Sequence, residues 1–296
     1  MNRLPPDEAT APMNADTRHA SPPRCAEVFT VNLRKKGLPG PLAEAVTPHV
    51  HRLLGFAQFN RVYRELPRCT PEEFSQIFLD ASKVRVELAG APLQAIPKTG
   101  PLLIVANHPL GFFDGMLIDA VLRTVRSEVS IMAHSMMTVI PDFQDRWFFV
   151  GRPGSRSRRN LTMRSLRRAM RWLADGKALL VFPAARVSRF HWRHLSVADR
   201  VWSPHVAAMA LQTRATVLPV YLHGAPNWTS RFLGAFLPVL QNVRAICAVE
   251  DYRGRTLRAT IGMPVQPAEL SGFATGQEAI EFLRQRMEQL AHSDRS

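Results

Sequence analysis

The sequence has few cysteines, no long apolar run and no apolar leader. Its three cysteines, Cys25, Cys69 and Cys247, are odd in number and far apart, so they predict neither a disulfide framework nor a metal site. No run reaches the roughly 18–20 apolar residues that cross a membrane. Residues 5–8 are Pro-Pro-Asp-Glu, where a signal peptide would need an apolar core. We therefore expect a cytoplasmic protein in a reducing compartment, which meets a membrane only from its surface.

Acidic residues are also scarce relative to basic ones. Lys and Arg total 38 against 24 Asp and Glu, which gives a formal net charge of +14 at pH 7. This balance predicts an acidic partner, which is a nucleic acid, an anionic membrane or an acidic carrier protein. The apolar share of 46% is ordinary for a globular protein, and 296 residues allow one large domain or two small ones.

Composition and periodicity divide the chain into three parts. Residues 1–26 are rich in Pro, Ala, Asp and Thr and predict a disordered leader. Residues 27–82 predict a short N-terminal helical region. Within it, residues 40–66 predict two helices with a break at Pro48. These helices either pack on the core or face a membrane. Residues 83–296 alternate strands with helices, which predicts an α/β domain with a mostly parallel central sheet flanked by helices.

The segment from Pro101 to Gly115 carries the strongest chemical signal. An apolar run ends at Ala106 and is followed by a tight loop, after which an apolar helical pattern begins near Asp114. A folded-back loop brings His108 and Asp114 together, and a carboxylate that holds one imidazole nitrogen leaves the other free to take a proton from a hydroxyl. Since no protein nucleophile is nearby, that hydroxyl belongs to a substrate.

Ordinary structural roles remain open for both residues of this pair. Asp114 also suits the N-cap of the helix that it precedes, a role that does not exclude catalysis. His108 also fits a loop histidine with ordinary hydrogen-bond partners.

The string from Asn107 to Gly111, followed by Asp114, resembles the first motif of the glycerolipid acyltransferase (PlsC-like) superfamily. That superfamily usually has four residues between His and Asp, whereas this chain has five, an HX5D pattern similar to the branch called hemolysin-like or ornithine-lipid O-acyltransferase. The resemblance implies that His108 is the general base and that Asp114 orients it. It also implies that Asn107 and Gly111 contribute to substrate binding.

Three later segments resemble the remaining motifs in order. Residues 148–152, Phe-Phe-Val-Gly-Arg, are similar to the second motif, in which Arg152 would bind an anionic part of a substrate. Residues 182–188 are similar to the third motif and include Pro183, Arg186 and Ser188. Residues 217–220, with Pro219 inside an expected strand, are similar to the fourth; a proline there predicts an edge, a bulge or a strand end.

The third motif departs from the main family, where it reads Phe-Pro-Glu-Gly-Thr-Arg. Here Ala184 and Ala185 replace Glu and Gly, which is closer to the hemolysin-like Phe-Pro-Ala-Gly form. In the main family this segment helps to hold the phosphate of the acceptor lipid. The change therefore places lysophosphatidate in doubt, favours a lyso-lipid with another head group, and leaves an inactive relative open.

A basic helix is expected between Asn160 and Asp175. Its apolar positions fall on one face, and four arginines fall on the other: Arg164, Arg167, Arg168 and Arg171. This face is either simply solvated or a surface for phosphates, lipid head groups or an acidic carrier.

The sequence thus predicts an O-acyltransferase of lipid metabolism and phospholipid biosynthesis. It would move a fatty-acyl group from acyl-ACP or acyl-CoA to a lysophospholipid or lyso-ornithine-type lipid, at the inner membrane as a peripheral protein. No metal, no cofactor and no nucleic-acid partner are expected. The alternative is a catalytically inactive acyltransferase fold that binds anionic membrane or nucleic-acid surfaces. A hydrolase also stays open, although the sequence has no Gly-x-Ser-x-Gly element of a serine lipase.

Overall fold

A computed structural model gives the structure of this chain. The described residues are 27–34, 37, 39–151, 156–185, 187–191, 196–199, 201–225, 229–230 and 238–292. The expected leader, residues 1–26, lies outside them. The expected boundary between residues 27–82 and 83–296 stays a prediction.

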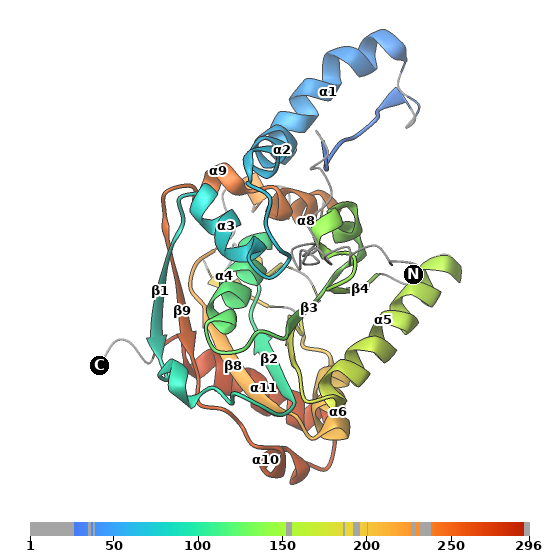
Figure 1. The fold of residues 1–296 in the computed structure, drawn as a ribbon. Coiled ribbons are helices and arrows are strands. Elements are labelled where there is room, and N and C mark those ends of the chain that lie inside the picture. Colours follow the sequence, from blue (N-terminus) through green and yellow to red (C-terminus); the bar gives the residue numbers. More distant parts are fainter. Residues whose placement is uncertain are drawn as a thin grey trace, which may run out of the picture.

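The centre of the molecule is a seven-stranded sheet with strand order β1-β9-β8-β2-β5-β3-β4 (Figure 1). The five strands from β8 to β4 are parallel to one another, while β9 pairs antiparallel with β8 and parallel with β1. The prediction of a mostly parallel central sheet is therefore confirmed. The strands are β1 (Arg85–Gly90), β2 (Leu102–Ala106), β3 (Val129–His134), β4 (Phe148–Val150), β5 (Ala178–Val181), β8 (Thr216–Leu222) and β9 (Thr256–Ile261), beside a separate antiparallel pair, β6 (Arg189–His191) and β7 (Ser196–Ala198).

Helices cover both faces of the sheet, which explains why β2 is apolar along its whole length. Leu102, Ile104 and Ala106 of β2 pack into one core cluster, and Leu103 and Val105 pack into the other. The first face carries α3 (Phe74–Ala81), α4 (Phe112–Arg123), α8 (Pro238–Ile246) and α9 (Val249–Tyr252), and the second carries α5 (Arg156–Ala174), α6 (Pro204–Thr213), α10 (Pro267–Ser271) and α11 (Gly276–Gln289).

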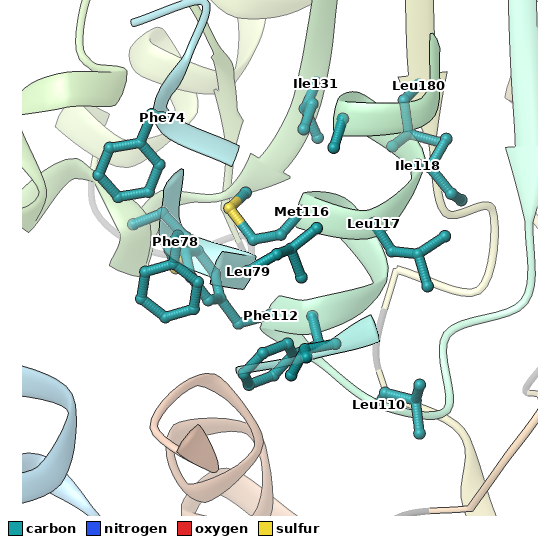
Figure 2. Packing of buried hydrophobic residues seen from close by; sticks show 14 of the residues in the cluster. Phe74, Phe78, Leu79, Leu110, Phe112, Met116, Leu117, Ile118, Ile131 and Leu180 are labelled. Carbon is teal, nitrogen blue, oxygen red and sulfur yellow. The ribbon is translucent and has the colours of Figure 1, made fainter. Parts of the chain in front are cut away.

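Aromatic rings fill the space between α3 and the start of α4. Figure 2 shows Phe74, Phe78 and Phe112 gathered beside the apolar face of α4. Phe78 packs edge-on against Phe112 with 5.0 Å between ring centroids, and Phe74 stacks on Phe78 at 5.9 Å. This packing fixes the first turn of α4, which follows the loop that bears His108.

Two helices precede this core and differ from the expected pair. α1 (Gly40–Leu54) runs through Pro48 and extends away from the body in Figure 1, and α2 (Phe56–Glu65) follows it. The predicted break at Pro48 is wrong. The break lies at Gly55, whose φ of 78° is left-handed and whose added Cβ would lie 2.4 Å from the Cys247 carbonyl oxygen.

One buried arginine joins the loops at the amino ends of the strands. Arg126 is 3% exposed and donates hydrogen bonds to the carbonyl oxygens of Gly100 at 2.8 Å and Gly176 at 2.7 Å. A longer bond of 3.3 Å reaches the carbonyl of Pro97, and Glu128 pairs with the same guanidinium. These contacts hold the entries of β2 and β5 together, at the end of the sheet opposite the loop after β2.

Among the described helices, none is both long and apolar enough to cross a membrane.

Candidate active site

The loop between β2 and α4 folds back tightly because of Gly111. This residue has φ 70° and ψ −123°, a conformation that side chains disfavour. A Cβ at Gly111 would lie 2.5 Å from the carbonyl oxygen of Ala245 in α8. A glycine is therefore needed where the loop passes close to α8. Its backbone conformation turns the chain back toward the end of β2.

His108 and Asp114 meet across this loop, as the sequence predicts. Nδ1 of His108 lies 2.9 Å from Oδ2 of Asp114, and the backbone N–H of Leu110 donates to the same oxygen at 2.8 Å. Asp114 is fully buried and lies in the first turn of α4, whose N-cap position is occupied by Gly111. The alternative of Asp114 as the helix N-cap is therefore wrong, because its carboxylate binds the preceding loop instead.

Burial governs the electrostatics of this pair. Loss of solvent raises the pKa of Asp114, while the hydrogen bonds from His108 and Leu110 act in the opposite direction. Oδ1 of Asp114 has no hydrogen-bond partner among the described residues. The pair therefore depends on the single Oδ2 contact to hold the imidazole.

The other groups of His108 are held by segments distant in sequence. Its ring stacks on Phe182 with centroids 4.1 Å apart, and its carbonyl oxygen accepts from the Ser188 N–H at 2.8 Å. Its own N–H donates to Oδ1 of Asp199 at 3.4 Å. Nε2 makes no hydrogen bond to any residue that the structure describes, and the side chain is 19% exposed. Nε2 is thus the group left to take a proton.

The third-motif segment contributes structure around His108. Pro183 is buried and its carbonyl accepts from the Ser203 N–H at 3.1 Å. Ser188 is 1% exposed, and its hydroxyl donates to Asp199. Asp199 is a residue of the site that the sequence does not predict. Its Oδ2 also accepts a hydrogen bond from the indole N–H of Trp202 at 3.0 Å. No local pattern signals this residue, because its partner His108 lies 91 positions away.

Asn107 and Pro219 both belong to the β2–β8 pairing. The amide of Asn107 donates to the Leu222 carbonyl at 2.9 Å and accepts from the Leu222 N–H at 2.7 Å, so it extends the ladder beyond Ala106. Pro219 pairs in register with Val105 in the middle of β8, an interior strand, so the prediction of an edge or a strand end is wrong. The β8–β9 ladder begins only at Val220, so the missing N–H of Pro219 leaves no gap in that ladder.

Two predicted anion-binding residues, Arg152 and Arg186, lie outside the described residues. The basic helix itself is present as α5, which has arginines and no acidic residue along its length. Five arginines of α5 are exposed: Arg159, Arg164, Arg167, Arg168 and Arg171. None of them forms an ion pair with a residue that the structure describes.

The described side chains contain no group of three or more His, Cys, Asp or Glu placed to hold a metal ion. No described serine or cysteine donates to Nε2 of His108, so the arrangement has the geometry of a general base without a protein nucleophile. Such a base activates a hydroxyl that another molecule supplies. Together with the α/β sheet, this arrangement fits a site that activates a hydroxyl or a water molecule for attack on a second substrate.

Comparison with known proteins agrees with this chemistry. The family model described as Acyltransferase matches residues 39–295, so the chain belongs to that family. The match confirms the prediction of an acyltransferase.

Two individual proteins are similar to the chain. One is the lyso-glycine lipid O-acyltransferase of Phocaeicola vulgatus, 23% identical over 195 residues, or 64% of this chain and 66% of the relative. The match thus spans just under two thirds of that relative. The other is the crystal structure of the 1-acyl-sn-glycerophosphate (LPA) acyltransferase PlsC from Thermotoga maritima, with a TM-score of 0.50 and 18% identity, covering 80% of this chain and 82% of that one. This likeness supports the α/β fold.

Proposed function

We propose that this protein transfers a fatty-acyl group from an acyl thioester to the hydroxyl of a lyso-lipid. The observation that carries the proposal is the state of His108. Asp114 holds Nδ1 at 2.9 Å, whereas Nε2 makes no hydrogen bond to a described residue. The family match supports acyl transfer, and a relative named for lyso-glycine lipid acylation supports a lyso-lipid acceptor.

The proposed reaction uses this chain's residues for proton transfer. Nε2 of His108 removes the proton from the acceptor hydroxyl as the oxygen attacks the thioester carbonyl. The tetrahedral intermediate then collapses, the carbon–sulfur bond breaks, and the proton passes from His108 to the leaving thiolate. Asp114 stabilises the imidazolium that exists between these two proton transfers.

The residues of the third motif are the basis for the acceptor head group that we propose. Ala184 and Ala185 stand where the main family has the Glu-Gly of its phosphate-associated motif, and Ala184 is buried. We therefore propose an amino-acid-linked lyso-lipid, of ornithine or glycine type, in preference to lysophosphatidate. The five-residue spacing between His108 and Asp114 supports membership in the hemolysin-like branch.

Donor and membrane are proposed from exposed surfaces. Leu42 and Leu53 of α1 are 52% and 48% exposed, which fits contact with the surface of the inner membrane. The arginines of α5 fit the acidic groups of an acyl carrier protein or the phosphates of coenzyme A. The donor is therefore acyl-ACP or acyl-CoA, and the protein acts at the cytoplasmic surface of the membrane.

The direct test combines each donor with a panel of acceptors. Purified protein is mixed with acyl-ACP or acyl-CoA and with lyso-ornithine lipid, lyso-glycine lipid or lysophosphatidate, and the diacyl product is measured by mass spectrometry. We expect product with an amino-acid-linked acceptor and none with His108→Ala, while His205→Ala, at an exposed histidine of α6, keeps wild-type activity. Folded wild-type protein that forms no product with any pair would overturn the proposal and favour a non-catalytic binding protein.

A further inference from the structure

We infer that Asp199 is a positioning residue of the acyl transfer proposed above. Its carboxylate ties Ser188 to the loop that carries His108. The inference rests on the proposed function for its kinetic consequence. The tie itself is visible in the contacts of Asp199 and does not depend on the reaction.

Three donors from three places in the sequence converge on this carboxylate. Oδ1 accepts from the Ser188 hydroxyl and, over a long 3.4 Å, from the backbone N–H of His108. Oδ2 accepts from the indole N–H of Trp202 at 3.0 Å. Asp199 forms no ion pair with a described basic residue. It is therefore a junction of hydrogen bonds and not half of a surface salt bridge.

The junction closes a ring around the backbone of His108. Asp199 binds the N–H of His108 and the hydroxyl of Ser188, while the N–H of Ser188 binds the carbonyl of His108 at 2.8 Å. Both main-chain polar groups of His108 are thus held by this pair of residues. A shift of Ser188 or Asp199 is transmitted directly to the backbone that aims Nε2.

Trp202 anchors the junction to the core. Its side chain is 1% exposed and packs in the cluster on the second face of the sheet. The position of its indole N–H is therefore fixed, and Asp199 must present an acceptor to it. An ionised carboxylate presents acceptors on both oxygens, whereas an asparagine amide has one acceptor and would turn its NH₂ toward one of the donors.

The charge of Asp199 also reaches the catalytic pair. It is one of the groups that raise the pKa of Asp114, after burial as the main cause. Asp199 is thus a second carboxylate of the site, in addition to holding the backbone of His108 by hydrogen bonds.

Four variants test this role: Asp199→Asn, Ser188→Ala, Trp202→Phe and the double variant of Asp199→Asn with Trp202→Phe. We expect Asp199→Asn to lower kcat by about 10–100-fold, since small misplacements of reacting groups cost this much. KM for donor and acceptor should stay within about twofold, because Asp199 touches neither substrate in this account. The double variant should regain part of the lost kcat, because removal of the indole N–H leaves the amide NH₂ without an opposing donor.

Hydrogen exchange provides a readout that needs no catalysis. In Asp199→Asn, the amides of His108 and Ser188 should exchange faster than in wild type, whereas Trp202→Phe alone should change them less. Unchanged exchange at both amides would overturn the inference. So would an activity loss that only follows a fall in folded protein. If wild type forms no product but the amides still loosen in Asp199→Asn, the proposed function fails and the structural tie stands.

Discussion

At the scale of single residues, His108 is held on every side but one. Asp114 binds Nδ1, Phe182 stacks on the ring, and Ser188 and Asp199 bind the backbone. A base that is fixed in this way does not have to be oriented when the substrate arrives, which lowers the entropic cost of reaching the reactive geometry. Nε2, which makes no hydrogen bond to a described residue, is then the imidazole nitrogen that is available for chemistry.

Asp114→Asn should lower kcat and should also change how the free energy of unfolding depends on pH. We expect kcat to fall roughly 10²–10⁴-fold, because a neutral amide does not stabilise the imidazolium. Burial raises the folded-state pKa of Asp114 above its ordinary value of 3.8. The stabilising contribution of the protonated acid is therefore complete below pH 3.8 and is lost as pH rises through the folded-state pKa.

The measurement is the free energy of unfolding as a function of pH for wild type and Asp114→Asn. The wild-type advantage over the variant should shrink as pH rises, while Asp175→Asn, at an exposed carboxylate after α5, should follow wild type. A wild-type advantage that grows with pH would contradict the raised pKa.

At the scale of elements, the loop between β2 and α4 depends on one backbone conformation. Gly111 combines φ 70° with a close approach to Ala245, so α8 sets the path of the loop as much as the loop sequence does. This dependence links α8, a helix distant in sequence from the loop, to the position of His108.

Gly111→Ala should disrupt both stability and activity. The strained backbone costs about 1–3 kcal/mol, and the clash with the Ala245 carbonyl at 2.5 Å adds to it. We expect a clear fall in melting temperature and at least a tenfold loss of kcat in the protein that remains folded. Gly254→Ala is the matched control, because Gly254 has a similar φ of 72° but no atom within 4 Å of its added Cβ. Equal effects of the two variants would contradict the role assigned to the Ala245 contact.

Local sequence signals predicted some elements and missed others. The apolar run of β2, the break after it and the turn residues sufficed to predict that His108 and Asp114 meet. At Pro48 the local pattern predicts a helix break, whereas α1 continues through this residue. Asn107 was predicted to bind substrate, yet both ends of its amide bind the backbone of Leu222, a partner 115 positions away.

At the scale of the whole molecule, the candidate site lies at the carboxyl ends of the strands, and the stabilising contacts of Arg126 lie at their amino ends. The carboxyl ends of β2 and β8 support His108 and Asn107, as is usual for sites in open α/β sheets. The amino ends of β2 and β5 are joined by Arg126. Such long-range contacts determine which segments surround the site, and a reading of local sequence patterns does not reveal them. The same limit explains why Asp199 was not found from the sequence.

Arg126→Met should therefore lower stability without changing the chemistry. Removal of the guanidinium leaves the partly buried carbonyls of Gly100 and Gly176 without their donor, and we expect a loss of about 1–3 kcal/mol in the free energy of unfolding. Urea denaturation measures this loss, and Arg255→Met, at an exposed position, should change little. The kcat of folded Arg126→Met protein should match wild type. A selective loss of kcat with unchanged stability would contradict the separation of the two ends.

A lipid profile by mass spectrometry shows directly whether His108 is the base of a lyso-lipid acyltransferase. The cells express the wild-type chain, His108→Ala or an empty vector. One set of cultures receives lyso-ornithine lipid and another receives lyso-glycine lipid. We expect a diacyl lipid that appears with wild type and is absent with His108→Ala and with the vector. Identical profiles in all three, with both proteins folded and equally abundant, would contradict the claim that His108 is the base of a lyso-lipid acyltransferase.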